Sequence, residues 1–150
     1  MGRRERPIHG KADREAASSA AEHYVIAMLG FNGIPAAKMP DGWPGYDLAA
    51  QLPGDVLPLR ISVKFRIDSD YQPYCRYAPH DQFDFIALVY KRPNEIRTWI
   101  LPRRVADATS GGQKDGMRFW SLRMLETRCA AYENNFGLAE GDAITSAARA

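Results

Sequence analysis

The segment Phe83–Tyr90 constrains the fold most, because nearly all of its residues are apolar. It is far shorter than the roughly 18 apolar residues that a membrane-spanning helix needs. Its length and its aromatic and β-branched residues are typical of a strand buried in the middle of a sheet. The sequence therefore predicts a protein built around a central β-sheet.

The flanking residues predict the elements around this strand. Residues 13–30 are rich in Ala and Glu, contain no proline and end at a glycine, which indicates a helix. Residues 59–67 alternate between apolar and polar side chains and predict a strand, so residues 46–52 and 58–67 are predicted to form a hairpin. Further predictions are strands at 34–39, 96–101 and 117–122, helices at 103–108 and 126–135, and a loop at 68–82. This order predicts an α/β (α+β) fold with a central mixed β-sheet flanked by helices.

Composition indicates one globular domain. The chain has 150 residues, 45% of them hydrophobic, and a net charge of +2, which excludes disordered, collagen-like and coiled-coil chains. There is no secretory-signal pattern at the N-terminus and no membrane-spanning run, so we expect a cytoplasmic protein without a membrane partner. Cys75 and Cys129 are too far apart for a metal-binding pair, and we expect free thiols.

Basic residues cluster near the N-terminus, and this cluster distinguishes an arm from the domain that follows it. We expect a flexible basic arm at 1–12, a single domain at 13–138 and a tail at 139–150. A basic arm can hold nucleic acid phosphates by releasing counterions, and it can equally be a solvated tail.

Four residues form the most informative constellation. Asp47 begins one strand of the predicted hairpin, and Ser62 and Lys64 lie two positions apart on the other, so they share a face. The hairpin can bring Asp47 beside them, and a helix packed on the strands could add Glu22. Each has a simpler reading: Asp47 as a turn cap, Lys64 as a solvated lysine, Glu22 as part of an exposed helix face.

Several segments in this order resemble the PD-(D/E)xK nuclease superfamily, in its Holliday-junction resolvase and restriction endonuclease-like branch. They are Glu22 with Gly30-Phe31, Gly45-Tyr46-Asp47-Leu48, Ile61-Ser62-Val63-Lys64, Phe83-Asp84-Phe85-Ile86 and Trp99-Ile100-Leu101-Pro102. The resemblance implies a restriction endonuclease-like fold and an enzyme that hydrolyses DNA phosphodiester bonds. It further implies Mg²⁺ or Mn²⁺ as cofactor, and small nucleases of this kind often act as homodimers.

The resemblance also implies the role of each residue. Asp47 would be the central metal ligand, Glu22 a second or water-mediated ligand, and the main-chain carbonyl of Val63 a further one. Lys64 would be the catalytic lysine. Carboxylates suit Mg²⁺, and a nearby ammonium stabilises charge that develops in the transition state.

Ser62 departs from the family, which has an acidic residue or Gln at this position. A neutral hydroxyl is a poor ligand for a hard cation, so the site loses a full negative charge. Either Glu22 makes up the deficit, or another carboxylate moves in, or the site no longer cuts; Glu15, Asp55 and Asp68 are the nearest in sequence. The alternative function is therefore a catalytically decayed nuclease-like fold that acts as a DNA-binding or protein-interaction module. A third reading is an unrelated α+β interaction domain whose charges decorate its surface.

Aromatic and basic residues mark a candidate DNA-binding segment. Tyr71, Tyr74 and Tyr77 alternate with Arg76, close to Arg66 of the preceding strand. Tyrosines can stack on bases and arginines can hold phosphates, as in proteins that bind single strands. The competing reading is that these tyrosines pack on the sheet. Asp84, at the start of the central strand, is predicted to be structural.

Overall fold

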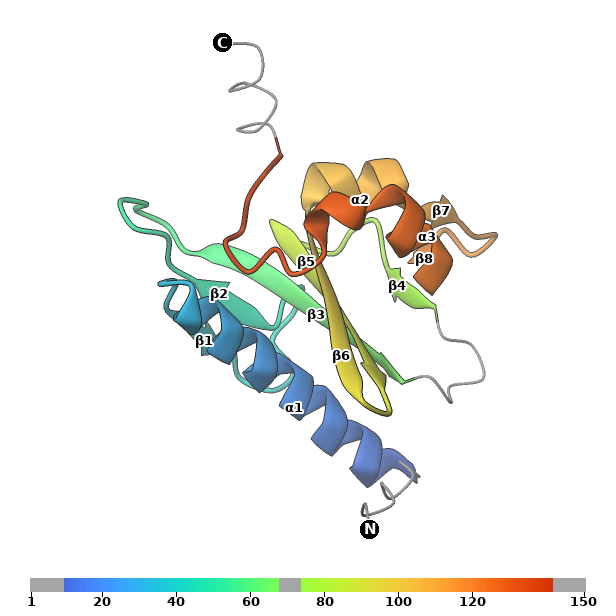
Figure 1. Cartoon of the computed structure of the whole chain (residues 1–150), viewed down its shortest axis with the longest axis horizontal. Helices are drawn as coiled ribbons and strands as arrows, with labels where there is room; N and C mark the ends of the chain where they lie inside the picture. Colours follow the sequence, from blue (N-terminus) through green and yellow to red (C-terminus); the bar gives the residue numbers. More distant parts are fainter. Residues whose placement is uncertain (1–9, 68–73, 142–150) are drawn as a thin grey trace.

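The structure of the protein is a computed structural model, and it describes residues 10–67 and 74–141. A five-stranded sheet in the order β1-β2-β3-β5-β6 forms its centre, with α1 on one face (Figure 1). The helices α2 and α3 lie on the other face with a second sheet, ordered β4-β8-β7. The elements are α1 (Gly10–Phe31), β1 (Ala36–Lys38), β2 (Leu48–Ala50), β3 (Leu59–Ile67), β4 (Cys75–Tyr77), β5 (Phe85–Arg92), β6 (Glu95–Pro102), α2 (Arg103–Thr109), β7 (Gly111–Gly112), β8 (Arg118–Trp120), α3 (Leu122–Arg128) and the 3₁₀ turn η1 (Ala130–Tyr132).

Helix α1 buries one stripe against the sheet. Ala21, Val25 and Leu29 recur every four residues and are almost fully buried, which is the spacing of one helix face. They pack in a core cluster with Ile61 of β3 and Phe85 of β5. The predicted helix is confirmed and begins earlier, so residues 10–12 of the expected arm belong to it. The rest of that arm lies outside the described residues.

The central sheet is mixed, as predicted. Strand β3 pairs with β5 in parallel, whereas β2 and β3, and β5 and β6, pair antiparallel. The first six residues of β5 are buried, which confirms the interior strand. Because strand side chains alternate between faces, Phe85 faces the α1 cluster and Ile86 faces a second cluster with α2 and α3. The predicted hairpin of residues 46–52 and 58–67 is confirmed as β2 and β3.

The second sheet differs from the sequence prediction. The segment predicted as a loop contains β4, and the glycine-rich segment after α2 contains β7; both pair with β8. Strands of two or three residues are too short for an alternating pattern, so tertiary pairing defines them. The last helix also begins earlier than predicted, because the Ser121 hydroxyl accepts the Met124 N–H and caps α3.

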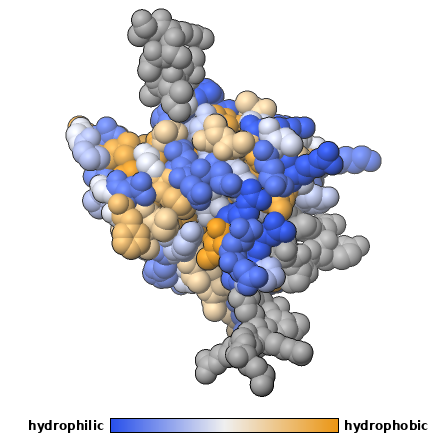
Figure 2. All heavy atoms as spheres, viewed as in Figure 1, coloured by the Kyte–Doolittle hydropathy of each residue, from blue (hydrophilic) through white to orange (hydrophobic). Residues whose placement is uncertain are grey.

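The buried apolar residues of the described part form two core clusters. Within the described ranges, no helix is both long and apolar enough to cross a bilayer. Figure 2 shows hydrophilic side chains over the middle of one face, with smaller apolar patches between them. Cys75 and Cys129 are buried free thiols, as expected.

Candidate active site

The Asp47 carboxylate is held at the point where β2 and β3 part. Leu48 pairs with Ile61, so Asp47 falls opposite Ser62, and the Asp47 N–H still donates to the Ile61 carbonyl at 2.9 Å. Oδ2 of Asp47 accepts the main-chain N–H of Val63 at 2.7 Å. The side chain therefore takes the place of a strand partner and is fixed against β3.

The strand neighbours of Asp47 on β3 are Ser62, Val63 and Lys64. In an extended strand the N–H and C=O of one residue point to the same side, so the Val63 carbonyl also faces the Asp47 side. Ser62 is only 4% exposed and shares with Lys64 the sheet face opposite α1. Lys64 is diagonal to Asp47, and such neighbours lie about 7–8 Å apart. Within the described residues, no hydrogen bond or ion pair engages the Lys64 ammonium.

Glu22 approaches the same edge from α1. Its side chain is 16% exposed, and Oε2 lies 3.2 Å from Nζ of Lys38. Lys38 is its ion-pair partner, and the buried Oε2 accepts no hydrogen bond from another donor among the described residues. Burial raises the pKa of Glu22, Lys38 opposes this rise, and the charge of Asp47 adds to it. Glu22 and Asp47 thus lie close enough to feel each other's charge.

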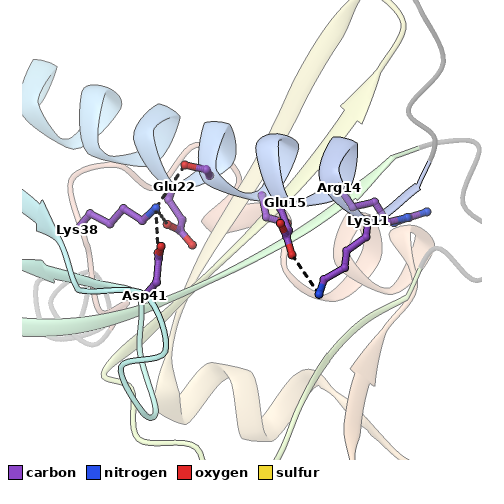
Figure 3. Close-up of a pocket in the computed structure, with 8 residues that line it drawn as sticks. Lys11, Arg14, Glu15, Glu22, Lys38 and Asp41 are labelled. Carbon is purple, nitrogen blue, oxygen red and sulfur yellow. Dashed lines mark hydrogen bonds and ion pairs between the residues drawn. The ribbon is translucent and has the colours of Figure 1, made fainter.

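Lys38 is a site residue that the sequence patterns did not identify. It reaches from β1 between Glu22 and Asp41, whose Oδ1 lies 3.6 Å from Nζ (Figure 3). Nζ also donates to the Ser19 hydroxyl of α1 at 3.3 Å. These groups line one end of a cavity of about 710 Å³ along α1. The pairing of β1 with β2 was the available signal, because it places Lys38 opposite Leu48, next to Asp47.

The predicted DNA-binding segment is only partly accessible. Tyr77 is fully buried, and its ring stacks on Trp120 with centroids 5.1 Å apart. This contradicts the expected stacking of Tyr77 on a base and supports the competing reading, in which the tyrosine packs in the core. Tyr74 is 38% exposed and contacts Phe119 edge-on, and Tyr71 lies outside the described residues.

The two arginines of this segment are tethered. Arg66 donates from Nε to the Tyr74 carbonyl and from Nη1 to the Phe65 carbonyl, each at 2.9 Å. Arg76 forms an ion pair with Asp115, and both side chains are more than one third exposed. The two guanidinium groups are therefore oriented by the protein, and Arg76 remains partly open to solvent.

Asp84 is structural, as its contacts with β3 demonstrate. Its carboxylate accepts the Arg60 main-chain N–H at 2.8 Å and the Arg60 guanidinium at 3.1 and 3.2 Å. These bonds join the starts of β3 and β5, which form the parallel pair. The Asp84 carboxylate therefore stabilises the pairing of β5 with β3, the strand that carries Ser62 and Lys64.

Comparison with known proteins identifies the fold. The sequence matches no protein-family profile and no curated protein. The structure is similar to Hjc, a Holliday junction resolvase from Archaeoglobus fulgidus, with a TM-score of 0.50, 13% identity and coverage of 72% of this chain and 86% of that one. It is also similar to the bacterial homing endonuclease I-Ssp6803I, with a TM-score of 0.56, 15% identity and coverage of 91% and 97%. The chain has a restriction endonuclease-like fold.

In this restriction endonuclease-like fold, the donor set suits a small, hard cation. The described residues contain no group of three or more His, Cys, Asp and Glu side chains that could hold a metal. Mg²⁺ in proteins is commonly held by one or two carboxylates and completes its shell with waters and substrate phosphates. Asp47 and Glu22 are two carboxylates close enough for their charges to interact, and the Val63 carbonyl faces the Asp47 side. The buried Oε2 of Glu22, which accepts no hydrogen bond within the described part, is a suitable ligand atom.

Proposed function

We propose that this protein is a metal-dependent endonuclease that hydrolyses DNA phosphodiester bonds. The observation that carries the proposal is the Asp47 carboxylate, fixed on the Val63 N–H at 2.7 Å at the diverging strands of a nuclease fold. The interaction between the Glu22 and Asp47 charges supports it, because two carboxylates in one neighbourhood favour a cation between them.

Each residue has a distinct task in this proposal. Asp47, Glu22 and the Val63 carbonyl would hold Mg²⁺ or Mn²⁺, which when bound polarises the phosphodiester and lowers the pKa of water. Lys64, with its ammonium free of partners among the described residues, orients the attacking water and stabilises charge on the phosphate. The water loses one proton as its oxygen bonds to phosphorus, the bond from phosphorus to the leaving sugar oxygen breaks, and that oxygen takes up one proton from solvent.

We propose DNA as the partner because two of the similar structures are enzymes that act on DNA, a Holliday junction resolvase and a homing endonuclease. The candidate contacts from the predicted segment are Arg66, Tyr74 and Arg76. Tyr77 is fully buried and is not among them. Trp43 joins them, because it is 47% exposed and lies on the loop between β1 and Asp47. The Trp43 and Tyr46 rings meet edge-on, with their centroids 6.4 Å apart. This leaves one face of the Trp43 ring available to stack on a base.

Ser62 favours one alternative, a catalytically decayed nuclease fold that binds DNA or protein. It is buried at 4% exposure and supplies no charge where the family has an acid. A Ser62→Asp variant separates the two. If the wild type does not cut and Ser62→Asp does, the native site is decayed.

The main test is cleavage of branched, duplex and single-stranded DNA with Mg²⁺ or Mn²⁺. Lys64→Met keeps the apolar stem but removes the ammonium, and Glu22→Gln removes a ligand charge. Both should abolish metal-dependent cutting. Asp55→Asn is the matched control, since Asp55 is an exposed carboxylate at the far turn of the same hairpin. Cutting that survives Lys64→Met and Glu22→Gln would refute the assignment.

A further inference from the structure

Lys38 lies between two carboxylates that differ in their exposure to solvent. Glu22 is a proposed metal ligand with a side chain that is 16% exposed. Asp41 is 97% exposed, on the loop that leads to Asp47. Nζ lies 3.2 Å from the first and 3.6 Å from the second. A lysine ammonium is a compact charge on a flexible stem, so it can shift between the two without losing a partner.

A metal ion and Lys38 compete for the same oxygen. Oε2 of Glu22 lies 3.2 Å from Nζ, and no other donor among the described residues holds this oxygen in place. A ligand to Mg²⁺ sits about 2.0–2.1 Å from the ion. Two cations on one carboxylate oxygen would repel each other at close range. Metal binding at Glu22 therefore requires the ammonium to move away.

We infer that Lys38 is a counter-ion with two positions: it neutralises Glu22 in the absence of metal and moves to Asp41 when a divalent cation binds. This inference rests on the proposed function, because it takes Glu22 as a metal ligand. Lys38 thereby lowers the metal affinity of the free protein, and Asp41 partly restores it by accepting the displaced ammonium. Ser19 of α1 also accepts a hydrogen bond from Nζ, at 3.3 Å.

Two variants give shifts of opposite sign. Lys38→Met removes the competing cation and should tighten Mn²⁺ binding about three- to fivefold, the range expected for a partly exposed ion pair. Asp41→Asn removes the second position and should weaken Mn²⁺ binding about two- to threefold. In the Lys38→Met background, Asp41→Asn should change the affinity very little, since no ammonium remains to be accepted.

The measurement is calorimetric titration of the intact protein with Mn²⁺, without DNA. Lys11→Met is the matched control: Lys11 lines the same cavity, is 91% exposed and pairs with Glu15 at 3.7 Å, so it should leave the affinity unchanged. Thermal unfolding checks that each variant folds.

Each outcome decides the inference. Weaker or unchanged binding in Lys38→Met overturns it and leaves the proposed nuclease intact. An Asp41→Asn effect that persists in the double variant also overturns it, because that result is a simple field effect of the lost charge. No Mn²⁺ binding by the wild type refutes the metal site of the proposed function, and the inference with it. Opposite shifts that vanish in the double variant support it.

Discussion

The Asp47 carboxylate and the Val63 N–H form a hydrogen bond of 2.7 Å, which gives Asp47 a structural duty beside its proposed catalytic one. The bond satisfies the main-chain N–H of Val63 in β3, which has no main-chain acceptor on β2. Substitutions at Asp47 can therefore change stability and chemistry independently.

Asp47→Asn should separate these two duties. The amide oxygen still accepts the Val63 N–H, so we expect a change in unfolding free energy below about 1 kcal/mol. The lost charge should reduce metal-dependent cleavage at least about 100-fold. Asp47→Ala should cost about 1–3 kcal/mol in addition, because the Val63 donor loses its acceptor. Denaturant unfolding and a cleavage assay measure both; equal stability loss in the two variants would contradict this role for the hydrogen bond.

Trp43 should report DNA binding directly. The other two tryptophans, Trp99 and Trp120, are fully buried, whereas Trp43 is 47% exposed. We therefore expect DNA to quench the accessible part of the fluorescence. Trp43→Ala should raise the Kd for DNA roughly five- to 100-fold, the range for one lost base stack. Leu57→Ala, at an exposed apolar residue of the β2–β3 turn, is the control, and an equal effect there would argue against stacking.

Tyr77→Phe should lower stability and leave DNA binding unchanged. The Tyr77 hydroxyl donates to Asp107 at 2.7 Å and lies 3.2 Å from the Ser110 hydroxyl. Losing these bonds should cost about 1 kcal/mol, measurable by denaturant unfolding. DNA affinity measured by fluorescence anisotropy should match the wild type. A large loss of affinity in a folded variant would return Tyr77 to the DNA surface.

Protonation of Asp84 should account for part of the stability that the fold loses at low pH. Partial burial opposes ionisation of Asp84, but the hydrogen bonds from Arg60 outweigh it and lower the pKa of Asp84. A lowered folded pKa gives stability that is present above the unfolded value of about 3.9 and is lost as pH falls through the folded value. Asp84→Asn should cost about 1 kcal/mol at pH 7. Its stability should also fall less steeply than that of the wild type below about pH 4, as measured by urea unfolding.

Periodic patterns were enough to predict the main elements. The apolar run of β5, the alternation of β3 and the Ala-rich α1 each bury a continuous face, so the pattern of burial is written in the order of the residues. The short strands β4 and β7 were not predictable in this way. They contain two or three residues, and they exist because β8 pairs with them.

The residues of the candidate site also divide into those that local sequence patterns identify and those that depend on tertiary contacts. Asp47, Ser62 and Lys64 were identified from one hairpin, where local spacing determines which side chains share a face. Lys38 was missed, although it is the ion-pair partner of Glu22. Its role depends on the packing of α1 over β1, which brings together residues sixteen positions apart in the sequence. Tyr77 was misjudged for a related reason, because its burial depends on Trp120, far along the chain.

The sequence by itself determined the mixed sheet, its interior strand and the residue types of the candidate site. These follow from short-range periodicity, which any strand or helix must satisfy to bury one face. Only the tertiary structure decided which charges meet: Glu22 with Lys38 rather than with solvent, and the Asp47 oxygen on the Val63 N–H. Charge pairing and burial depend on contacts between distant segments, and those contacts exist only once α1 has packed on the sheet.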